Sequence, residues 1–536
     1  MSTEPIGDGA VAASLAESCR RWADRPALTG SDRTLTYAEM GGAIAALARA
    51  YRSLGIKTGD RIVCQLPPCP EHVIAMAAAW ECGAVHAGAH PDLTGPELSA
   101  VVGQVGAAAL LFQPRRHLAD PESPLRATRA AHPEARVIVH GRPAAAGELA
   151  LAELLDPGSA KPAAAPAPPP HDLSVLLRTS GTTGLPKTVM ETLPALWAKV
   201  QFFARALQPG PDDVHLMYLP VSHAFGMKLS LMALATGGHL VLSDRFSPSG
   251  ALELVGRHRV TVLPATPTHL TLLLSAIDSG RHPIASLRWV PTAAAPLLPS
   301  LAAAVYQRLG VEIMNVYGCS EGFLTLTTRR EDVLLGSVGR IVFRGPPGSP
   351  PDGRLAILDV ERDEVLAGGV TGEIAYGADK PVRYWGEPPI ASGGWYRTGD
   401  IGMLDGDGRL YVRGRLKELI NRGGLKVPCA EVEAALRGVP AVADCAVIPS
   451  PDPVLGEAIC ACVVPTSQPA PELAAVRASL SEVLARHKLP DELCVLDEIP
   501  HTSMGKVDRS ALAARVLQGR VHRTRFRPVA PVETGR

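Results

Sequence analysis

The stretch RTSGTTGLPKTVMET, Arg178 to Thr192, combines glycines, hydroxyl side chains and a lysine within a few residues. It follows SVLL (174–177), an apolar run typical of a buried strand, so the chain passes from a sheet directly into a glycine-rich turn. Glycines let the backbone turn tightly and point its N–H groups inward, hydroxyls add donors, and Lys187 adds a positive charge. Together these groups predict a phosphate-binding loop.

A Walker A loop also binds phosphate, but its spacing does not fit this chain. That motif requires Gly, four residues, and then Gly-Lys-Ser/Thr. Pro186 stands where the second glycine would follow Gly181, and the later pair Gly505-Lys506 lacks both the first glycine and the hydroxyl. The spacing therefore excludes a P-loop nucleotide hydrolase.

Outward from this loop, strand and helix patterns alternate on both sides, which predicts α/β layers with mainly parallel strands. The segment KPAAAPAPPP (161–170) is typical of a linker. Short β segments begin near Ser337, and a compact α+β texture follows Gly414. We therefore predict an N-terminal part over 1–414, with α/β units at about 1–165 and 171–336 and a β unit at about 337–414, then a C-terminal domain over 415–518 and a flexible tail over 519–536.

The overall composition is that of an ordinary globular protein, with 46% hydrophobic and 20% charged residues. Lys plus Arg equal Asp plus Glu at 53 each, so no global charge favours nucleic acid as a partner. Ten cysteines without C-x-x-C spacing indicate buried thiols in a reducing compartment, and we expect no zinc. We also expect no signal peptide and no membrane span, hence a cytoplasmic protein.

Four further stretches carry groups suited to chemistry: NVYGCSEG (315–322), GWYRTGDIGMLDGDG (394–408), GRLKELINRGG (414–424) and IPHTSMGKVDR (499–509). Each alone has a structural interpretation, because Tyr317 could be core, Glu321 and Asp400 turn acids, and Lys506 a solvated cation. Their order along one chain favours a functional interpretation instead.

With these motifs the chain resembles the acyl-adenylate-forming superfamily, which includes acyl- and aryl-CoA synthetases, firefly luciferase and the adenylation domains of peptide synthetases. The resemblance covers about Leu35 to Leu512. TSGTTGLPK matches the pyrophosphate loop, YGCSE the YGxTE motif with Ser320 for threonine, and YRTGD and GRLKELI the ribose and hinge motifs.

The resemblance implies a fold and a reaction. The fold is a large N-terminal part of two α/β units and a β unit, followed by a small mobile α+β C-terminal domain. In the reaction, a carboxylate attacks the α-phosphate of ATP, pyrophosphate leaves, and a thiol then accepts the acyl group from the adenylate.

The resemblance also implies roles for individual residues. Glu321 would bind Mg²⁺, Tyr317 would lie against adenine, and Asp400 and Arg415 would bind the ribose. Lys506 would contact the carboxylate and the α-phosphate, where negative charge concentrates. The implied nucleotide-binding set is Thr179, Ser180, Gly181, Thr182, Thr183, Gly184, Lys187, Ala295, Pro296, Tyr317, Gly318, Ser320, Asp400 and Arg415.

A lysine on a separate domain can be withdrawn after the first step. The resemblance implies rotation about Lys417, after which Gly423 and Gly424 help to form the thiol tunnel. Replacement of Lys506 by alanine is expected to abolish adenylation and to spare thioester formation from supplied adenylate.

The acid and the thiol are less well defined by the sequence. MYLPVSHAFGM (217–227) resembles the PxxHxxG stretch of acyl- and aryl-CoA ligases, which places His223 at the acyl pocket, although a buried structural histidine fits as well. Ala293 and Ala294 replace the usual glycine pair and, with Cys319, would line a pocket for a small or flat apolar acid.

The leading hypothesis is an AMP-forming acid–CoA ligase for an aliphatic or aromatic acid, with ATP, Mg²⁺ and coenzyme A as cofactors. One alternative is a free-standing adenylation enzyme that loads the phosphopantetheine of an acyl carrier protein. A non-catalytic nucleotide-binding protein is the third.

Overall fold

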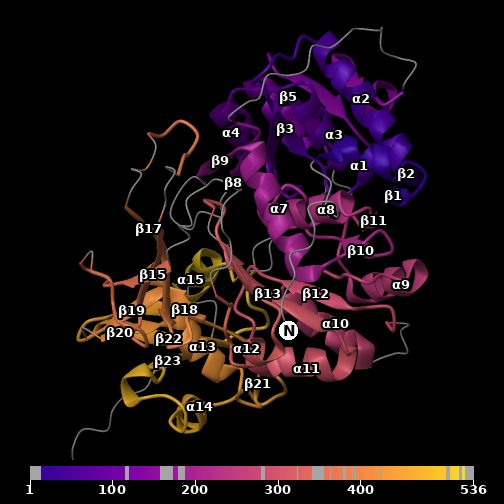
Figure 1. Cartoon of the computed structure of the whole chain (residues 1–536). Coiled ribbons are helices and arrows are strands. Elements are labelled where there is room, and N and C mark those ends of the chain that lie inside the picture. The colour runs from indigo at the N-terminus through magenta and orange to yellow at the C-terminus, as the bar shows by residue number, and fades with distance from the viewer. Residues whose placement is uncertain are drawn as a thin grey trace, which may run out of the picture.

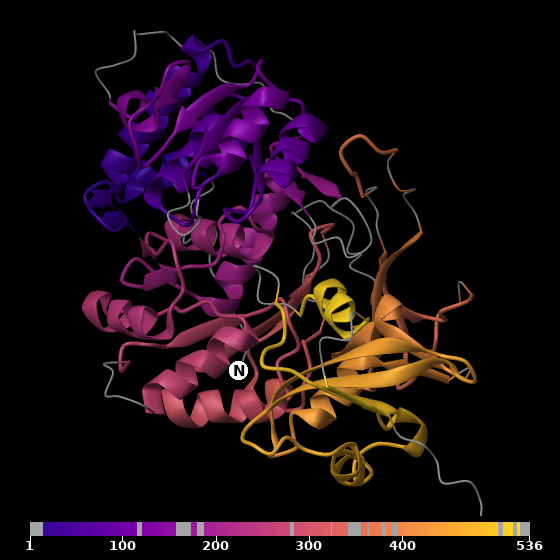
Figure 2. The ribbon, with the colours of Figure 1, turned by 180° about the vertical axis from the view of Figure 1, so that it is seen from behind.

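The structure is a computed structural model, shown as a ribbon coloured along the chain (Figure 1). Most described elements of the first two hundred residues, indigo to magenta, gather at one end of the molecule, and the described elements of the last quarter, orange to yellow, lie beside the middle of the chain in both views (Figure 2). The residues described are 14–114, 120–156, 173–178, 187–278, 284–322, 324–340, 355–362, 364–377, 382–388, 390, 394–423, 425–501, 507–517 and 522–525.

The first sheet has seven strands in the order β7-β6-β5-β3-β4-β8-β9. All neighbours are parallel except β8 and β9, which form the antiparallel edge. Its strands are β3 (Arg61–Gln65), β4 (Val85–Gly88), β5 (Ala107–Phe112), β6 (Arg136–Val139), β7 (Glu148–Ala150), β8 (Val175–Arg178) and β9 (Thr188–Glu191).

The second sheet combines the strand orders β2-β1-β11-β10 and β12-β13-β14. Single parallel bridges of Val262 to His215 and to Trp289 join the two sets into one layer. Its strands are β1 (Pro26–Thr29), β2 (Thr34–Thr36), β10 (Val214–Met217), β11 (His239–Leu242), β12 (Trp289–Thr292), β13 (Glu312–Gly318) and β14 (Leu324–Thr327).

Each sheet takes strands from both sides of the proline-rich linker. The early strands β1 and β2 join the second sheet through β11, and the later strands β8 and β9 join the first sheet through β4. One hydrophobic core, with members as far apart as Leu15 and Leu410, spans both sheets. The two α/β layers are therefore interlocked, because neither sheet is complete without strands from the other side of the linker.

Local sequence explains where several helices begin and end. Thr36 with Glu39 and Thr94 with Glu97 form capping boxes at the starts of α2 and α4. The helices of this part are α1 (Leu15–Arg21), α2 (Tyr37–Ser53), α3 (Pro70–Glu81), α4 (Gly95–Val105), α5 (Ser123–Ala131), α6 (Leu151–Leu154), α7 (Leu193–Leu207), α8 (Ala224–Ala235), α9 (Pro248–His258), α10 (Pro267–Asp278), α11 (Pro299–Leu309) and α12 (Arg330–Leu334).

A four-stranded antiparallel sheet follows, in the order β15-β16-β17-β18. This confirms the β texture expected after Ser337. Its strands are β15 (Leu355–Leu358), β16 (Gly372–Gly377), β17 (Trp395–Leu404) and β18 (Leu410–Arg415).

The C-terminal α+β part has its own sheet, β20-β19-β22-β23-β24, with β21 paired to β22. Two hydrophobic clusters that share no residue with the large core support it. Its elements are η1 (Leu416–Glu418), β19 (Leu419–Arg422), β20 (Leu425–Pro428), α13 (Cys429–Leu436), β21 (Val442–Asp452), β22 (Gly456–Pro465), α14 (Leu473–Leu480), η2 (Arg486–Lys488), β23 (Glu492–Val495), α15 (Arg509–Leu517) and β24 (His522–Arg525). The predicted α/β multidomain class is confirmed.

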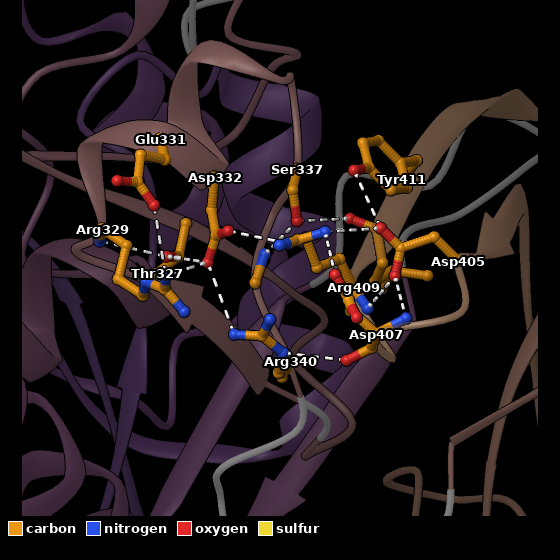
Figure 3. A network of polar contacts seen from close by, with 12 residues as sticks. Thr327, Arg329, Glu331, Asp332, Ser337, Arg340, Asp405, Asp407, Arg409 and Tyr411 are labelled. Atoms are coloured by element: carbon orange, nitrogen blue, oxygen red, sulfur yellow. Dashed lines mark hydrogen bonds and ion pairs between the residues drawn. The ribbon is translucent and has the colours of Figure 1, made fainter.

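A polar network holds the β17–β18 turn against α12 and β14 (Figure 3). Asp332 is buried, and Arg409 Nε donates to its Oδ1 at 2.8 Å while Arg340 lies 3.6 Å from its Oδ2. Arg409 also pairs with Asp405 at 3.1 Å and with Asp407 at 2.6 Å. Asp405, Asp407 and Arg409 lie in the turn that joins β17 to β18. The network therefore fixes the strand pair that carries Asp400 and Arg415.

None of the helices in the described part of the chain has the length and hydrophobicity required to cross a bilayer.

Candidate active site

Tyr317, Asp400 and Arg415 meet at the end of β13, although they belong to three separate motifs. The Tyr317 hydroxyl donates to Asp400 Oδ2 at 2.7 Å, and Arg415 Nε lies 2.9 Å from Asp400 Oδ1. Burial and the neighbouring Asp400 charge raise the pKa of Tyr317 well above its usual value, so its hydroxyl stays protonated. One aromatic ring, one carboxylate and one guanidinium are thus brought together, as a nucleoside site requires.

Three tyrosines surround Glu321. The Tyr384 hydroxyl donates to Glu321 Oε1 at 2.9 Å and lies 2.9 Å from the Tyr396 hydroxyl, and the Tyr376 hydroxyl donates to the Glu321 carbonyl at 3.2 Å. Burial raises the pKa of all three tyrosines, and the Glu321 charge adds to the shift. All three therefore remain protonated, and Tyr384, which contacts the carboxylate, fixes its direction.

Sequence reasoning gave these tyrosines no role. Tyr396 opens the YRTGD motif and Tyr384 lies only twelve residues earlier, but nothing local indicates that the two hydroxyls meet beside Glu321. Their meeting depends on the pairing of β16 with β17 and on a bridge between Val189 and Tyr384.

Lys187 lies beside the same group, at the exit of the glycine-rich loop. Its Nζ is 4.6 Å from the centre of the Tyr384 ring and 3.0 Å from Glu387 Oε2. The lysine side chain is half-exposed, so a phosphate oxygen can replace Glu387 at small cost. The structure thus brings the predicted phosphate-binding lysine next to the predicted metal ligand, Glu321.

The segment Ala293–Pro296 follows β12, whose residue Thr292 pairs with Asn315 on β13, so it lies beside the end of β13, where Tyr317 stands. Ala294 has a φ of +76°, a left-handed conformation that L side chains rarely adopt. This is one of the two positions where alanine replaces the usual glycine. Ala294 is therefore held in a strained backbone conformation that a glycine would adopt without cost.

His223 forms the N-cap of α8, at the junction of the two sheets. A Cβ on Gly88, at the end of β4, would lie 2.7 Å from the Ser222 carbonyl oxygen, and one on Gly226 would lie 2.4 Å from the Pro220 carbonyl oxygen. These close backbone approaches fix His223 at the carboxyl edge of both sheets. Gly318 is the last residue of β13, and Cys319 and Ser320 follow it directly.

A buried group of charges lies near this edge and was not expected from the sequence. Glu191 on β9 pairs with Lys199 on α7, and Lys228 on α8 is influenced electrostatically by both and by Cys319. A signal was present, since Lys228 is the one charged residue in the apolar helix AFGMKLSLMALA.

The remaining predicted residues lie at the domain junction or outside the described parts. Lys417 stands in η1 directly after β18, where partial burial and the Arg415 charge lower its pKa. Gly423 has a φ of +57°, and its N–H donates to the Leu455 carbonyl at 2.8 Å. The residues outside the described ranges are Thr179, Ser180, Gly181, Thr182, Thr183, Gly184, Gly424 and Lys506.

This arrangement suits chemistry on a polyanion. The Tyr317–Asp400–Arg415 group, an oriented carboxylate and a lysine are connected through Tyr384 and the end of β13, and carboxylate oxygens are the ligands that Mg²⁺ prefers beside phosphates. Because Tyr384 fixes one oxygen of Glu321 next to Lys187, the donor set fits the implied magnesium ion. Fold and site together define an enzyme that activates a carboxylic acid with ATP.

The chain belongs to the AMP-binding enzyme family: the family profile matches residues 15–381, and the profile of the AMP-binding enzyme C-terminal domain matches residues 431–506. It is accordingly an AMP-forming acid–thiol ligase, as the motifs predicted.

Similar proteins cover almost the whole chain. The 2-hydroxy-7-methoxy-5-methyl-1-naphthoate–CoA ligase of Streptomyces carzinostaticus is 34% identical over 532 residues, 95% of this chain and 93% of that protein. A salicylyl-CoA synthase/salicylate adenylyltransferase of a Streptomyces species is 30% identical over 515 residues, 93% and 92% of the two chains. The anthranilate CoA ligase AuaEII in complex with anthranoyl-AMP shares the fold, with a TM-score of 0.83, 23% identity and coverage of 95% and 98%.

Proposed function

We propose that this protein converts an aromatic carboxylic acid into its acyl-adenylate and then into the coenzyme A thioester. The main observation that supports this proposal is that Tyr317, Asp400 and Arg415 contact one another close to Glu321 and Lys187. The two alanine methyl groups of Ala293–Ala294 near the same edge and the ring acids named for the two Streptomyces relatives support an aromatic substrate.

In the first step, an oxygen of the substrate carboxylate forms a bond to the α-phosphorus of ATP, and the bond to the pyrophosphate oxygen breaks. Lys187 neutralises charge on the leaving phosphates, and Tyr317, Asp400 and Arg415 hold the nucleoside so that the α-phosphate faces the acid. Glu321 would hold Mg²⁺, which would neutralise negative charge on the phosphates. Lys506 would contact the α-phosphate and the carboxylate.

In the second step, the thiol sulfur attacks the acyl carbon, AMP leaves, and the thiol proton passes to solvent. We propose that the two steps use different positions of a C-terminal domain that begins near Arg415. Separate hydrophobic clusters on the two sides of η1 support a boundary there, with Lys417 as the hinge. Gly423 and Gly424 would then border the thiol.

We place the reaction in the cytoplasm. All ten cysteines are free, and Cys460 and Cys494 remain thiols with their sulfurs 3.4 Å apart, which fits a reducing compartment.

The test is mass spectrometry of the full chain with ATP, MgCl₂, coenzyme A and matched pools of aromatic and aliphatic acids. The expected product is an aryl-CoA with AMP and pyrophosphate. An aryl-adenylate that accumulates and reacts only with holo-carrier protein would replace coenzyme A by a carrier as acceptor. Absence of pyrophosphate release with every acid would overturn the proposal.

A further inference from the structure

Two apolar helices beside the site each contain a buried lysine. Lys199 on α7 and Lys228 on α8 are each 5% exposed, and Glu191 on β9 is 4% exposed. Charged side chains are almost never this buried unless they are paired. Glu191, Lys199 and Lys228 therefore form a buried charged cluster whose balance of charge must be explained.

The cluster contains two lysines and one glutamate, so one positive charge has no counter-charge within it. Lys199 Nζ pairs with Glu191 Oε1, while Glu191 Oε2 has no hydrogen-bond partner among the described atoms. Lys228 makes no hydrogen bond or ion pair within the described part of the chain and is influenced by Glu191, Lys199 and Cys319 through space. Burial lowers the pKa of Lys228 to about 8, so the cation is held at a cost.

The cluster lies beside the turn that bears Glu321. A Cβ added to Gly322 would lie 3.9 Å from Lys199 Nζ, and Gly322 directly follows Glu321. Cys319, which acts on Lys228, lies in the same turn. Lys228 is also in the second turn of the helix that His223 caps, one turn from Phe225. Lys228 thus belongs to the helix that begins at His223, and it lies within electrostatic range of Cys319 in the turn that bears Glu321.

We propose that Lys228 is a specificity-determining residue that binds an oxygen substituent carried by the acid in addition to its reacting carboxylate. This inference rests on the proposed function. The reacting carboxylate must face the α-phosphate, so only a second group can reach Lys228. An ammonium donor selects an oxygen acceptor, either a phenolic oxygen or a second carboxylate.

The test measures kcat/KM for adenylation with benzoate, the three hydroxybenzoates and the three benzenedicarboxylates. The wild-type chain is expected to prefer at least one substituted acid over benzoate by about 10- to 100-fold, the range of one charge-assisted hydrogen bond. Lys228→Met should remove that preference while benzoate turnover is kept. Lys57→Met, which changes an exposed lysine, is the matched control and should keep the preference.

A second variant separates charge from hydrogen bonding. Lys228→Gln retains a donor without charge, so it should retain a preference for a hydroxyl and lose one for a carboxylate. The response of Lys228→Gln thus distinguishes a phenolic hydroxyl from a second carboxylate as the group that Lys228 binds.

Failure of this inference can be told apart from failure of the function. If the wild-type chain adenylates aromatic acids but shows no preference for any oxygen substituent, Lys228 has no such role, and that result alone overturns the inference. Equal loss of turnover with all acids in both folded variants would also overturn it. If no aromatic acid is adenylated by the wild-type chain, the proposed function itself fails.

Discussion

Asp400 and Arg415 face each other as register partners on β17 and β18, with Arg415 Nε 2.9 Å from Asp400 Oδ1. Their pairing is a consequence of the hairpin itself and does not require a nucleotide. Because the second oxygen of Asp400 accepts from Tyr317, the carboxylate is oriented before ATP arrives. Such preorganisation reduces what must be ordered on binding.

Asp400→Asn should therefore weaken ATP binding more than it weakens the fold. The amide keeps the shape but removes the charge that holds Arg415, so we expect the KM for ATP to rise about 10- to 100-fold. Initial rates of pyrophosphate release at varied ATP measure this. Asp32→Asn, at an exposed loop acid, is the control. An unchanged KM for ATP in Asp400→Asn would remove Asp400 from the nucleotide site.

Tyr384→Phe tests the orientation of Glu321. The substitution deletes the 2.9 Å hydrogen bond to Glu321 Oε1 and keeps the ring beneath Lys187. Residues that orient a metal ligand typically contribute about 10- to 100-fold to metal affinity or activity. We expect the Mg²⁺ concentration for half-maximal activity to rise by about that factor, measured by titration at saturating ATP. A loss of activity that excess Mg²⁺ leaves unchanged would argue against this role.

The sequence predicted the motifs and the fold class because both depend on local patterns. TSGTTGLPK and YGCSE are short and specific, and the alternation of strands and helices identifies α/β layers. The exchange of β1 and β8 between sheets could not be predicted, since it depends on pairings across the linker that no local pattern encodes. The contact of Tyr384 with Glu321 escaped prediction for the same reason.

The buried charges were missed for a different reason. Helical patterns predict which face of a helix is apolar, but α8 is buried all round, so Lys228 looked like an interruption of an apolar run. Only the three-dimensional neighbours Glu191 and Lys199 indicate that the lysine belongs to a cluster.

Ala294→Gly should relieve backbone strain at the pocket. A non-glycine residue with a φ of +76° costs about 1–2 kcal/mol, and the greater freedom of glycine in the unfolded chain offsets about 0.5–1 kcal/mol of the gain. We expect the free energy of unfolding to increase by about 0.5–1 kcal/mol, measured by urea denaturation. Ala293→Gly, next to it, lacks the positive φ and should destabilise the protein instead. Equal effects of the two substitutions would contradict the strain argument.

The last prediction concerns the stability cost of Lys228 and its dependence on pH. Its pKa is about 8 in the folded protein and 10.5 without burial, so the unfolded chain binds more protons between these values. Below pH 8 the buried ammonium lowers the free energy of unfolding by its full amount. As the pH rises from about 8 to 10.5 this destabilisation is lost, so the free energy of unfolding rises. A shift of this size corresponds to about 3 kcal/mol. Lys228→Met should thus be more stable than the wild-type chain at pH 7 by up to about that amount, and its advantage should shrink as pH approaches 10.5.

The measurement is denaturant unfolding of both proteins across pH 7–10.5. Glu191, Lys199 and Cys319 act on the same lysine, so the two free energies of unfolding are compared as a difference, in which the titration of groups common to both proteins largely cancels. A constant difference across this range would mean that Lys228 is charged to the same extent in the folded and unfolded chains, and that burial does not raise the energy of its ammonium.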